Sequence, residues 1–393
     1  MPGALEGLKI LDFTALYPGP LATQWLADNG ADVLRVEAPD RPDLLRWMPP
    51  YDRDDKGAAW RAVNRNKRSI VINLKVPAAL AVVQRLVAEY DVLVEQFRPG
   101  VLAKLGLGFE ALRTVQPRLI WCAISSYGQT GPWRDRPGHD IGFLATAGVA
   151  HHTGRPGQGP TPNLTLPGDF GGGTFGAVAG ILAAVVSRQR TGQGQLVDVS
   201  MADGALWMNT MAASAALAAH RDVAPASEAL NGGAAYDYYP TADGRWLAVG
   251  ALEPKFWAMF CAAIGAPELA QQAAATPDEM RALKATVAAI LARRSLADWQ
   301  AVFADVLCCV DAVLTPTEAV AHPQFAARAM LVQVPDENAA FHTQVANPVR
   351  FGATPQRYAR TAVEAGHDAD AVLAAAGYDA AGIAALRDAG AVG

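Results

Sequence analysis

The first 200 residues alternate short apolar runs with amphipathic helical patterns. Residues 20–29, 78–89 and 173–190 carry apolar positions at helical spacing, and Gly30 and Gly192 stand where such helices end. Six runs rich in β-branched residues predict strands at residues 8–13, 32–37, 69–74, 91–97, 119–125 and 195–200. Strands that alternate with helices of this length predict an α/β fold, with a parallel sheet and helices on its faces.

The pattern weakens between residues 224 and 233 into a polar segment that contains Pro and Gly, which predicts a linker. Beyond it, a strand and two helices are expected at residues 246–250, 254–264 and 282–294. They indicate a smaller second domain that runs to about residue 323. Strand-like pieces at residues 331–334 and 349–351 and a helix at 369–376 follow, and they can return to the first domain. Residues 48–56, with two prolines and several charges, predict an exposed loop.

Composition narrows the class of protein. With 393 residues, 51% hydrophobic and 18% charged, the chain is globular and long enough for two domains. Its net charge of −5 argues against a nucleic-acid partner and leaves an anionic ligand open. The four cysteines lack a CxxC spacing, which favours reduced thiols and a cytoplasmic protein. The longest apolar run, residues 175–186, is shorter than the ~20 residues of a membrane span, and no signal peptide is expected.

Three acid/base residues stand in distinctive surroundings. His139 lies in Pro-Gly-His-Asp, Asp169 precedes the glycines 171–173, and Glu253 precedes Pro254. Two bases on opposite sides of one carbon can remove a proton from one face and return it to the other, as in a racemase without a cofactor. Each residue also has a structural interpretation: a helix N-cap for Asp169, an ion pair of His139 with its neighbour, and a first-turn helix acid for Glu253.

The glycines 171–173 have two interpretations that the sequence leaves open. They can expose backbone N–H groups at a helix start to an oxyanion, or they can allow close helix packing. No Gly-x-Gly-x-x-Gly follows the first strand, so no dinucleotide cofactor is expected. The adjacent His151 and His152 have no carboxylate or thiol cluster beside them, so no metal site is expected either.

Basic residues gather near two predicted strand ends, where open α/β sheets bind ligands. These residues are Arg61, Arg65, Lys67, Arg68, Lys75, Arg98 and Lys104. Arg and Lys side chains suit a polyphosphate, and surface salt bridges are the alternative.

Motifs along almost the whole chain resemble those of the family III CoA-transferase superfamily. They include Gly30-Ala31-Asp32-Val33, Asn64-Arg65-Asn66-Lys67-Arg68-Ser69, Glu95-Gln96-Phe97-Arg98-Pro99-Gly100, Tyr127-Gly128-Gln129-Thr130-Gly131-Pro132 and Thr191-Gly192-Gln193-Gly194-Gln195. The sequences around His139, Asp169 and Glu253 are similar to the motifs of one branch, the α-methylacyl-CoA racemases. Formyl-CoA-type transferases carry Gln-Ala-Gly-Pro where this chain has residues 17–20, Tyr-Pro-Gly-Pro.

This resemblance implies a large Rossmann-like domain of residues 1–223 and 324–393 and a small α+β domain of residues 224–323. It implies an interlocked homodimer in which His139 and Asp169 come from one subunit and Glu253 from its partner. The implied reaction interconverts (2R)- and (2S)-2-methylacyl-CoA thioesters by 1,1-proton transfer through an enolate. His139 and Asp169 are the two bases, Glu253 orients His139, and CoA enters only as part of the substrate.

The resemblance also implies a set of contacts to CoA. The expected residues are Ile72, Asn73, Leu74, Lys75, Gln96, Phe97, Arg98, Lys104, Gly138, Asp140 and Phe143. The chain departs from the racemase pattern at Gly142-Phe143, where Asn-Tyr is usual, and at Ala38, where an Arg is frequent, so the acyl group stays open. Two alternatives remain: CoA transfer to a free acid through an Asp169 anhydride, and an acyl-CoA-binding protein without activity.

Overall fold

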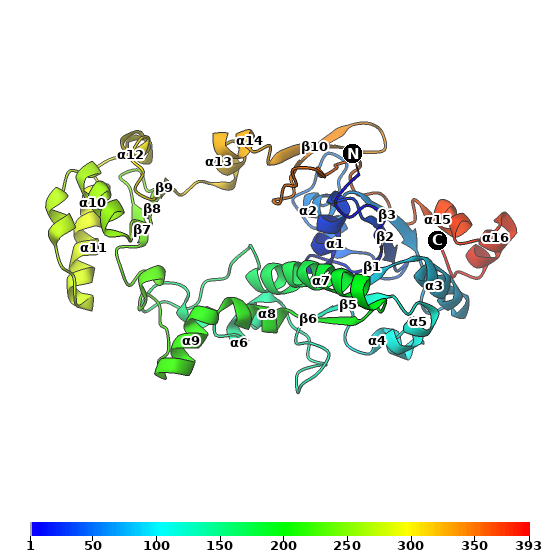
Figure 1. The fold of residues 1–393 in the computed structure, drawn as a ribbon. Helices are drawn as coiled ribbons and strands as arrows, with labels where there is room; N and C mark the ends of the chain where they lie inside the picture. The colour runs from blue at the N-terminus through cyan, green and yellow to red at the C-terminus, as the bar shows by residue number, and fades with distance from the viewer. Residues whose placement is uncertain (1) are drawn as a thin grey trace. The chain divides into compact units, whose positions relative to one another are not determined.

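The computed structural model describes residues 2–393, which divide into two compact units (Figure 1). The first unit consists of residues 2–147, 163–208 and 324–393, and the second of residues 148–162 and 209–323. Both ends of the chain therefore contribute to the first unit, and the second unit is inserted between them.

Two segments assigned to the larger domain from the sequence, residues 148–162 and 209–223, group with the second unit instead. Side-chain contacts explain the difference. Arg155 pairs with Asp237 at 2.7 Å, and the His152 ring bonds to the Asn209 amide oxygen at 2.8 Å. These partners are distant in sequence, so hydropathy alone does not indicate them.

The first unit is built on a six-stranded sheet with the order β3-β2-β1-β4-β5-β6, in which all pairs are parallel. Its strands are β1 (Lys9–Phe13), β2 (Asp32–Glu37), β3 (Lys67–Val71), β4 (Val92–Glu95), β5 (Ile120–Ser125) and β6 (Leu196–Ser200). The α/β fold predicted from the alternating pattern is confirmed. In this order the chain direction across the sheet reverses between β1 and β4.

Helices and short 3₁₀ turns connect these strands. In chain order they are α1 (Pro18–Asp28), the 3₁₀ turn η1 (Leu44–Trp47), α2 (Ala58–Val63), α3 (Pro77–Glu89), α4 (Val101–Lys104), α5 (Phe109–Val115), α6 (Asp140–Thr146), the π-helix η3 (Gly168–Phe175), α7 (Gly176–Thr191) and α8 (Met201–Met208). The C-terminal part adds α14 (Pro323–Ala327), the antiparallel pair β10 (Leu331–Pro335) and β11 (Phe341–Val345), α15 (Ala369–Ala375) and α16 (Ala380–Asp388). The strand expected at residues 349–351 does not form.

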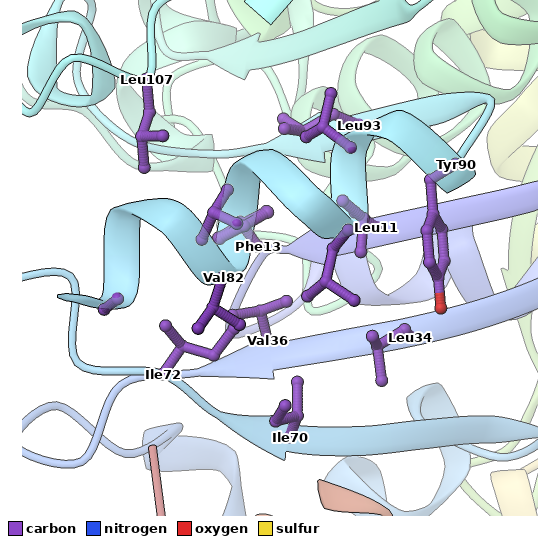
Figure 2. Packing of buried hydrophobic residues seen from close by; sticks show 14 of the residues in the cluster. Leu11, Phe13, Leu34, Val36, Ile70, Ile72, Val82, Tyr90, Leu93 and Leu107 are labelled. Carbon is purple, nitrogen blue, oxygen red and sulfur yellow. The ribbon is translucent and has the colours of Figure 1, made fainter. Parts of the chain in front are cut away.

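One face of the sheet carries the main hydrophobic core (Figure 2). Alternate strand residues such as Leu11, Leu34 and Ile70 are fully enclosed, because a side chain on every second strand position points to the same face. The helices α3, α15 and α16 supply the facing apolar side chains, among them Val82 and Leu373. The other face is covered by α1 and α7. The sequence-distant C-terminal helices thus complete a core that the first hundred residues begin.

Strand β3 begins two residues earlier than its apolar run indicates, at Lys67. This side chain is only 1% exposed. Its ammonium donates to the Asp12 carboxylate at 3.0 Å, to the Pro20 carbonyl at 2.8 Å and to the Asn64 amide oxygen at 3.0 Å. A buried charge is tolerated only when it is paired and hydrogen-bonded, and these three contacts meet that condition. The strand start was not predicted because a lysine interrupts the apolar pattern by which strands are recognised in a sequence.

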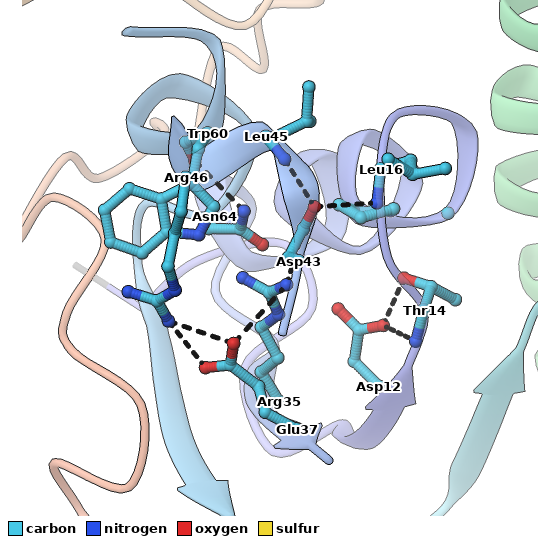
Figure 3. Close-up of polar contacts among 12 residues, drawn as sticks. Asp12, Thr14, Leu16, Arg35, Glu37, Asp43, Leu45, Arg46, Trp60 and Asn64 are labelled. Carbon is cyan, nitrogen blue, oxygen red and sulfur yellow. Dashed lines mark hydrogen bonds and ion pairs between the residues drawn. The ribbon is translucent and has the colours of Figure 1, made fainter. Parts of the chain in front are cut away.

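Further buried ion pairs join β2 to the loop that follows it (Figure 3). Arg35 donates to Asp43 at 2.6 Å, and Arg46 donates to both Glu37 carboxylate oxygens at 2.9 Å. The Arg46 guanidinium also lies over the Trp60 ring, 4.1 Å from its centroid. These pairs fasten the loop after β2 to the sheet.

The apolar stretch expected to form a core helix belongs to one continuous helical segment, Gly168–Thr191. By length and composition alone this segment could cross a membrane. In the fold, its α7 part packs on β5 and β6, with Ala177, Ile181 and Ala184 buried. The core helix of an α/β domain meets the same criteria. The helix ends as predicted, with Gly192 in the left-handed conformation.

The loop at residues 48–56 is fastened to the β10–β11 pair by charged side chains. Arg53 bonds to Asp336 at 2.9 Å, and the His342 ring lies 3.2 Å from the same carboxylate. Asp52, Asp54 and His342 come close enough to hold a metal ion, but Arg61 already pairs with both carboxylates. The cluster is therefore a complete ion-pair network.

The second unit combines a three-stranded antiparallel sheet, ordered β7-β8-β9, with helices. Its elements are the 3₁₀ turn η2 (Ala150–His152), α9 (Thr210–Ala219), the 3₁₀ turn η4 (Ala229–Asn231), β7 (Asp237–Pro240), β8 (Trp246–Val249), α10 (Pro254–Ala263), the 3₁₀ turn η5 (Pro267–Gln271), α11 (Pro277–Leu291), α12 (Leu296–Phe303), β9 (Val310–Ala312) and α13 (Pro316–Val320). Phe260, Trp299 and Phe303 stack in its own hydrophobic core. Thr276 and Glu279 form a capping box at the start of α11.

Candidate active site

A cavity of about 630 Å³ in the first unit opens beyond the carboxyl ends of the central strands. Its wall includes residues that directly follow β1, β4 and β5. The lining residues are Leu16, Tyr17, Pro18, Arg41, Gln96, Phe97, Arg98, Pro99, Val101, Ile124, Ser125, Ser126, Arg134, Arg136, Pro137, Gly138, His139, Asp169 and Met201. Open α/β sheets bind ligands where the strand order reverses, and here that point lies between β1 and β4.

His139 lines this cavity from the start of α6. Its backbone is extended, with φ −133°, and it occupies the N-cap position of that helix. The side chain is exposed, and its ring makes no hydrogen bond within residues 2–393. Both ring nitrogens are therefore available to a substrate and to an orienting group.

Asp169 lines the same cavity from the first turn of η3 and is partly buried. The Asp140 carboxylate lies beneath this turn and accepts the backbone N–H groups of Gly168 at 2.7 Å and of Asp169 at 3.0 Å. Burial, together with the nearby Asp140 charge, raises the pKa of the Asp169 carboxyl to about 6, although His139 opposes this shift. The site thus holds an aspartate that exchanges its proton near neutral pH.

Replacing Asp140 with asparagine is expected to lower the pKa of Asp169, because a negative charge is removed while an acceptor oxygen remains for the two N–H groups. The ¹³C resonance of the Asp169 side-chain carboxyl, followed from pH 3 to pH 8, will show its midpoint at lower pH than in the unmodified protein. Asp135→Asn, at an exposed position of the same loop, is the control. An unmoved midpoint in Asp140→Asn would show that burial alone sets the shift.

The glycines 171–173 serve close packing. The helix begins at Gly168 as a π-helix, so these three residues lie within its turns and the interpretation of a helix start at residue 173 is wrong. A Cβ on Gly172 would stand 2.6 Å from the Met201 carbonyl oxygen, and one on Gly171 would stand 2.2 Å from the Met208 sulfur. Helix α8 can therefore approach the Asp169 helix only because side chains are missing there.

The same contact predicts a stability effect from the other side. In Gly204→Ala the new Cβ would lie 2.2 Å from the Gly172 Cα, which is backbone and cannot rotate away. We expect a loss of about 1–3 kcal/mol of unfolding free energy, measured by urea denaturation, together with a displaced Asp169 turn. Gly352→Ala, where nothing lies within 4 Å, is the control and should leave the midpoint unchanged. Equal midpoints for both variants would contradict this packing.

The predicted CoA contacts fall into two groups. Gln96, Phe97, Arg98 and Gly138 line the cavity with His139 and Asp169. The other group lies outside its lining: the side chains of Ile72 and Phe143 are 1% and 0% exposed, because they belong to the protein interior, and the Asp140 carboxylate is occupied beneath the Asp169 turn. The rest of this group is Asn73, Leu74, Lys75 and Lys104.

Sequence reasoning missed two basic side chains of the lining, Arg134 and Arg136. Together with Arg41 and Arg98 they give the cavity four guanidinium groups, whereas Asp169 is its one carboxylate among the described lining residues. A detectable signal was present, since both arginines stand within five residues of His139. An excess of Arg with exposed donors suits an anionic ligand with several phosphate or carboxylate groups.

Glu253 belongs to the second unit, where it is exposed and precedes Pro254 at the start of α10. Its extended backbone, with φ −71° and ψ 141°, places it at the N-cap, and its side chain makes no capping hydrogen bond. The carboxylate is therefore not used by its own helix.

The model of CoA-transferase family III matches residues 5–369. The chain belongs to CoA-transferase family III. Within the family, the chain is 37% identical to the α-methylacyl-CoA racemase of Homo sapiens over 323 residues, 81% of this chain and 80% of that protein. It is 35% identical to the mouse racemase over 84% of this chain and 82% of that protein.

Transferases of the family are similar at the same level. The succinyl-CoA–D-citramalate CoA-transferase of Chloroflexus aurantiacus is 38% identical over 271 residues, 68% of this chain and 67% of that protein. Among solved structures, a CaiB/BaiF family protein from Brucella suis superposes with a TM-score of 0.83 and 28% identity, covering 96% of this chain and 100% of that one. This family III member thus has the fold of a solved relative, and the racemases and transferases of the family are similar to it at comparable identity.

Proposed function

We propose that this protein is a racemase that interconverts (2R)- and (2S)-2-methylacyl-CoA thioesters. The thioester carbonyl acidifies the α-hydrogen. His139 removes it from one epimer and Asp169 from the other, and the opposite residue returns a proton to the planar enolate. The observation that carries the proposal is one cavity lined by both residues, in which the pKa of Asp169 is raised to about 6.

That shift matters because a residue that both removes and returns a proton works best when its pKa lies near the operating pH. An ordinary aspartate, with a pKa of about 3.9, would hold its proton too weakly to serve as the acid. A nucleophilic aspartate needs no such shift, since it attacks as the carboxylate. Burial of Asp169 therefore favours proton transfer over anhydride formation.

The arginine-rich lining supports a CoA ester as the substrate. The four guanidinium groups of Arg41, Arg98, Arg134 and Arg136 match the phosphates of CoA. No further cofactor enters this mechanism, because the thioester itself delocalises the enolate charge. The arginines bind and orient the ester, and His139 and Asp169 carry out the proton transfer.

We further propose a homodimer in which Glu253 of the partner subunit orients His139. Two features support it: the His139 ring lacks a hydrogen bond in the described chain, and the Glu253 carboxylate is exposed and unused by its own helix. Helix α9 supports an additional protein contact. It is apolar, none of its residues is buried, and Met211 and Leu217 are 74% and 80% exposed. Sedimentation at low and high protein concentration tests the dimer.

The deciding experiment follows both epimers of a 2-methylacyl-CoA by proton NMR in D₂O, without any acceptor acid. A racemase removes the α-proton signal from both epimers and interconverts them. If no exchange occurs, but CoA migrates once a free carboxylic acid is added, Asp169 is a nucleophile and the protein is a transferase. Binding of the esters without either reaction would leave an inactive acyl-CoA-binding protein.

A further inference from the structure

Tyr17 is a hydrogen-bond donor in the cavity that the proton transfer so far leaves unused. It lines the cavity with His139 and Asp169. Its hydroxyl has no hydrogen-bond partner anywhere in residues 2–393. Burial raises the pKa of this phenol above its usual range, so the hydroxyl keeps its proton at neutral pH.

The backbone holds Tyr17 firmly from both sides. The N–H of Leu16 donates to the Asp43 carboxylate at 3.2 Å, and that carboxylate is fixed by Arg35 at 2.6 Å (Figure 3). On the other side, the Tyr17 carbonyl accepts the N–H of Leu21 at 3.1 Å, in the first turn of α1. Buried charges and a helix therefore fix this short turn.

Leu16 adopts a left-handed conformation, with φ 63°. A leucine in this region costs on the order of 1–2 kcal/mol, so the surroundings must stabilise it. Strained backbone conformations of this kind are concentrated at functional sites. Here the strained residue, Leu16, directly precedes Tyr17, and both residues line the cavity. The Tyr17 ring also packs on Phe170, with centroids 6.0 Å apart, and Phe170 adjoins Asp169 in sequence. The tyrosine is thereby linked to the element that carries the base.

The enolate needs a donor that the Asp169 helix does not readily supply. The N–H groups of Gly168 and Asp169 are taken by the Asp140 carboxylate, and the N–H of Phe170 by the Leu166 carbonyl at 2.8 Å. The glycines 171–173 lie within helical turns. With these three N–H groups occupied, a hydroxyl donor in the cavity wall is well placed to meet the charge that develops on the thioester oxygen.

We propose that Tyr17 is a further catalytic residue, whose hydroxyl donates a hydrogen bond to the thioester oxygen as the enolate forms. The α-C–H electron pair becomes the C=C bond, the carbonyl π pair moves to the oxygen, and the proton goes to His139 or Asp169. The phenol keeps its own proton throughout, and reprotonation of the α-carbon reverses these shifts. This inference rests on the proposed racemase function.

The test is Tyr17→Phe, which keeps the ring packed on Phe170 and removes only the hydroxyl. We expect kcat for α-proton exchange in D₂O to fall roughly 10²–10³-fold for both epimers, the usual loss of one oxyanion donor. KM should change little, because the lost interaction forms only as charge develops. Tyr51→Phe, which removes a surface hydroxyl bonded to the Trp47 carbonyl, is the matched control and should keep full activity.

The outcomes separate the two proposals. If the unmodified protein exchanges no α-proton, the racemase function fails, whatever Tyr17 does. If it exchanges the proton and Tyr17→Phe retains kcat within threefold, with the same circular dichroism spectrum, the role of Tyr17 is overturned and the racemase stands. A Tyr17→Phe protein that raises KM with unchanged kcat also overturns it, since the hydroxyl would then serve binding alone.

Discussion

Replacement of His139 by alanine is expected to abolish epimerisation and leave α-proton exchange in one epimer only. Asp169 still lies in the cavity and can remove the proton that faces it, exchange it with D₂O and return deuterium to the same face. The opposite face has lost its base. We expect epimerisation to fall by at least about 10³-fold, within the range for loss of a general acid–base group. Proton NMR and chiral analysis of the ester measure both quantities.

Asp169→Asn should give the mirror image, with exchange confined to the other epimer, because His139 then acts alone. This pair of single-face exchanges distinguishes two bases from one base that serves both faces. His151→Ala, an exposed histidine of the second unit, is the control. A His139→Ala protein that still interconverts the epimers would overturn the assignment of this base.

Lys67→Met is expected to be among the most destabilising single substitutions in the sheet. It removes the ammonium from Asp12, which is fully buried and has Lys67 as its ion-pair partner at 3.0 Å. That partner contributes to lowering the pKa of Asp12, so its loss leaves an uncompensated buried charge. Breaking a buried pair in this way costs about 3–5 kcal/mol. The urea midpoint at an unchanged m value measures the loss.

Lys75→Met is the matched control, since it removes the same group from an exposed pair with Asp40. Surface pairs contribute about 0–1 kcal/mol, so its midpoint should hardly move. Asp12→Asn combined with Lys67→Met should recover part of the lost unfolding free energy, because the buried carboxylate that has no ion-pair partner is then removed as well. Equal midpoints for the two lysine variants would show that solvent reaches the Asp12 carboxylate after all.

The sequence was most informative about the sheet. Its strands are runs of β-branched residues, and β2 was predicted with its observed bounds, residues 32–37. The start of β3 was missed because Lys67 is a buried charge, whose place depends on Asp12 far away in sequence. The sequence predicts only one strand of the β10–β11 pair. β10 carries three aliphatic residues in Leu331–Pro335, whereas β11 contains His342 and Gln344 and depends on its pairing with β10.

For the candidate site, motif context pointed to His139 and Asp169, and the structure places both on one cavity. The π-helical turn at Gly168 was not predicted, because its geometry depends on the Asp140 carboxylate and on the close approach of α8. The sequence marks residues 17–20 as a difference from the formyl-CoA-type transferases but predicts no role for the Tyr17 hydroxyl. Its significance comes from the left-handed Leu16 and the buried Asp43, which only the folded chain brings together.

The pairing of the last residues with β3 has a consequence for biosynthesis. Ile72 forms a bridge with Val392, and the N–H of Gly393 donates to the Val71 carbonyl at 3.2 Å. These late residues leave the ribosome only after the whole second unit, residues 148–162 and 209–323, has been made. The inserted unit can therefore finish folding while the edge beside β3 is still open. During translation, the backbone groups of residues 71–72 therefore stay without their C-terminal partners until the end of the chain has emerged.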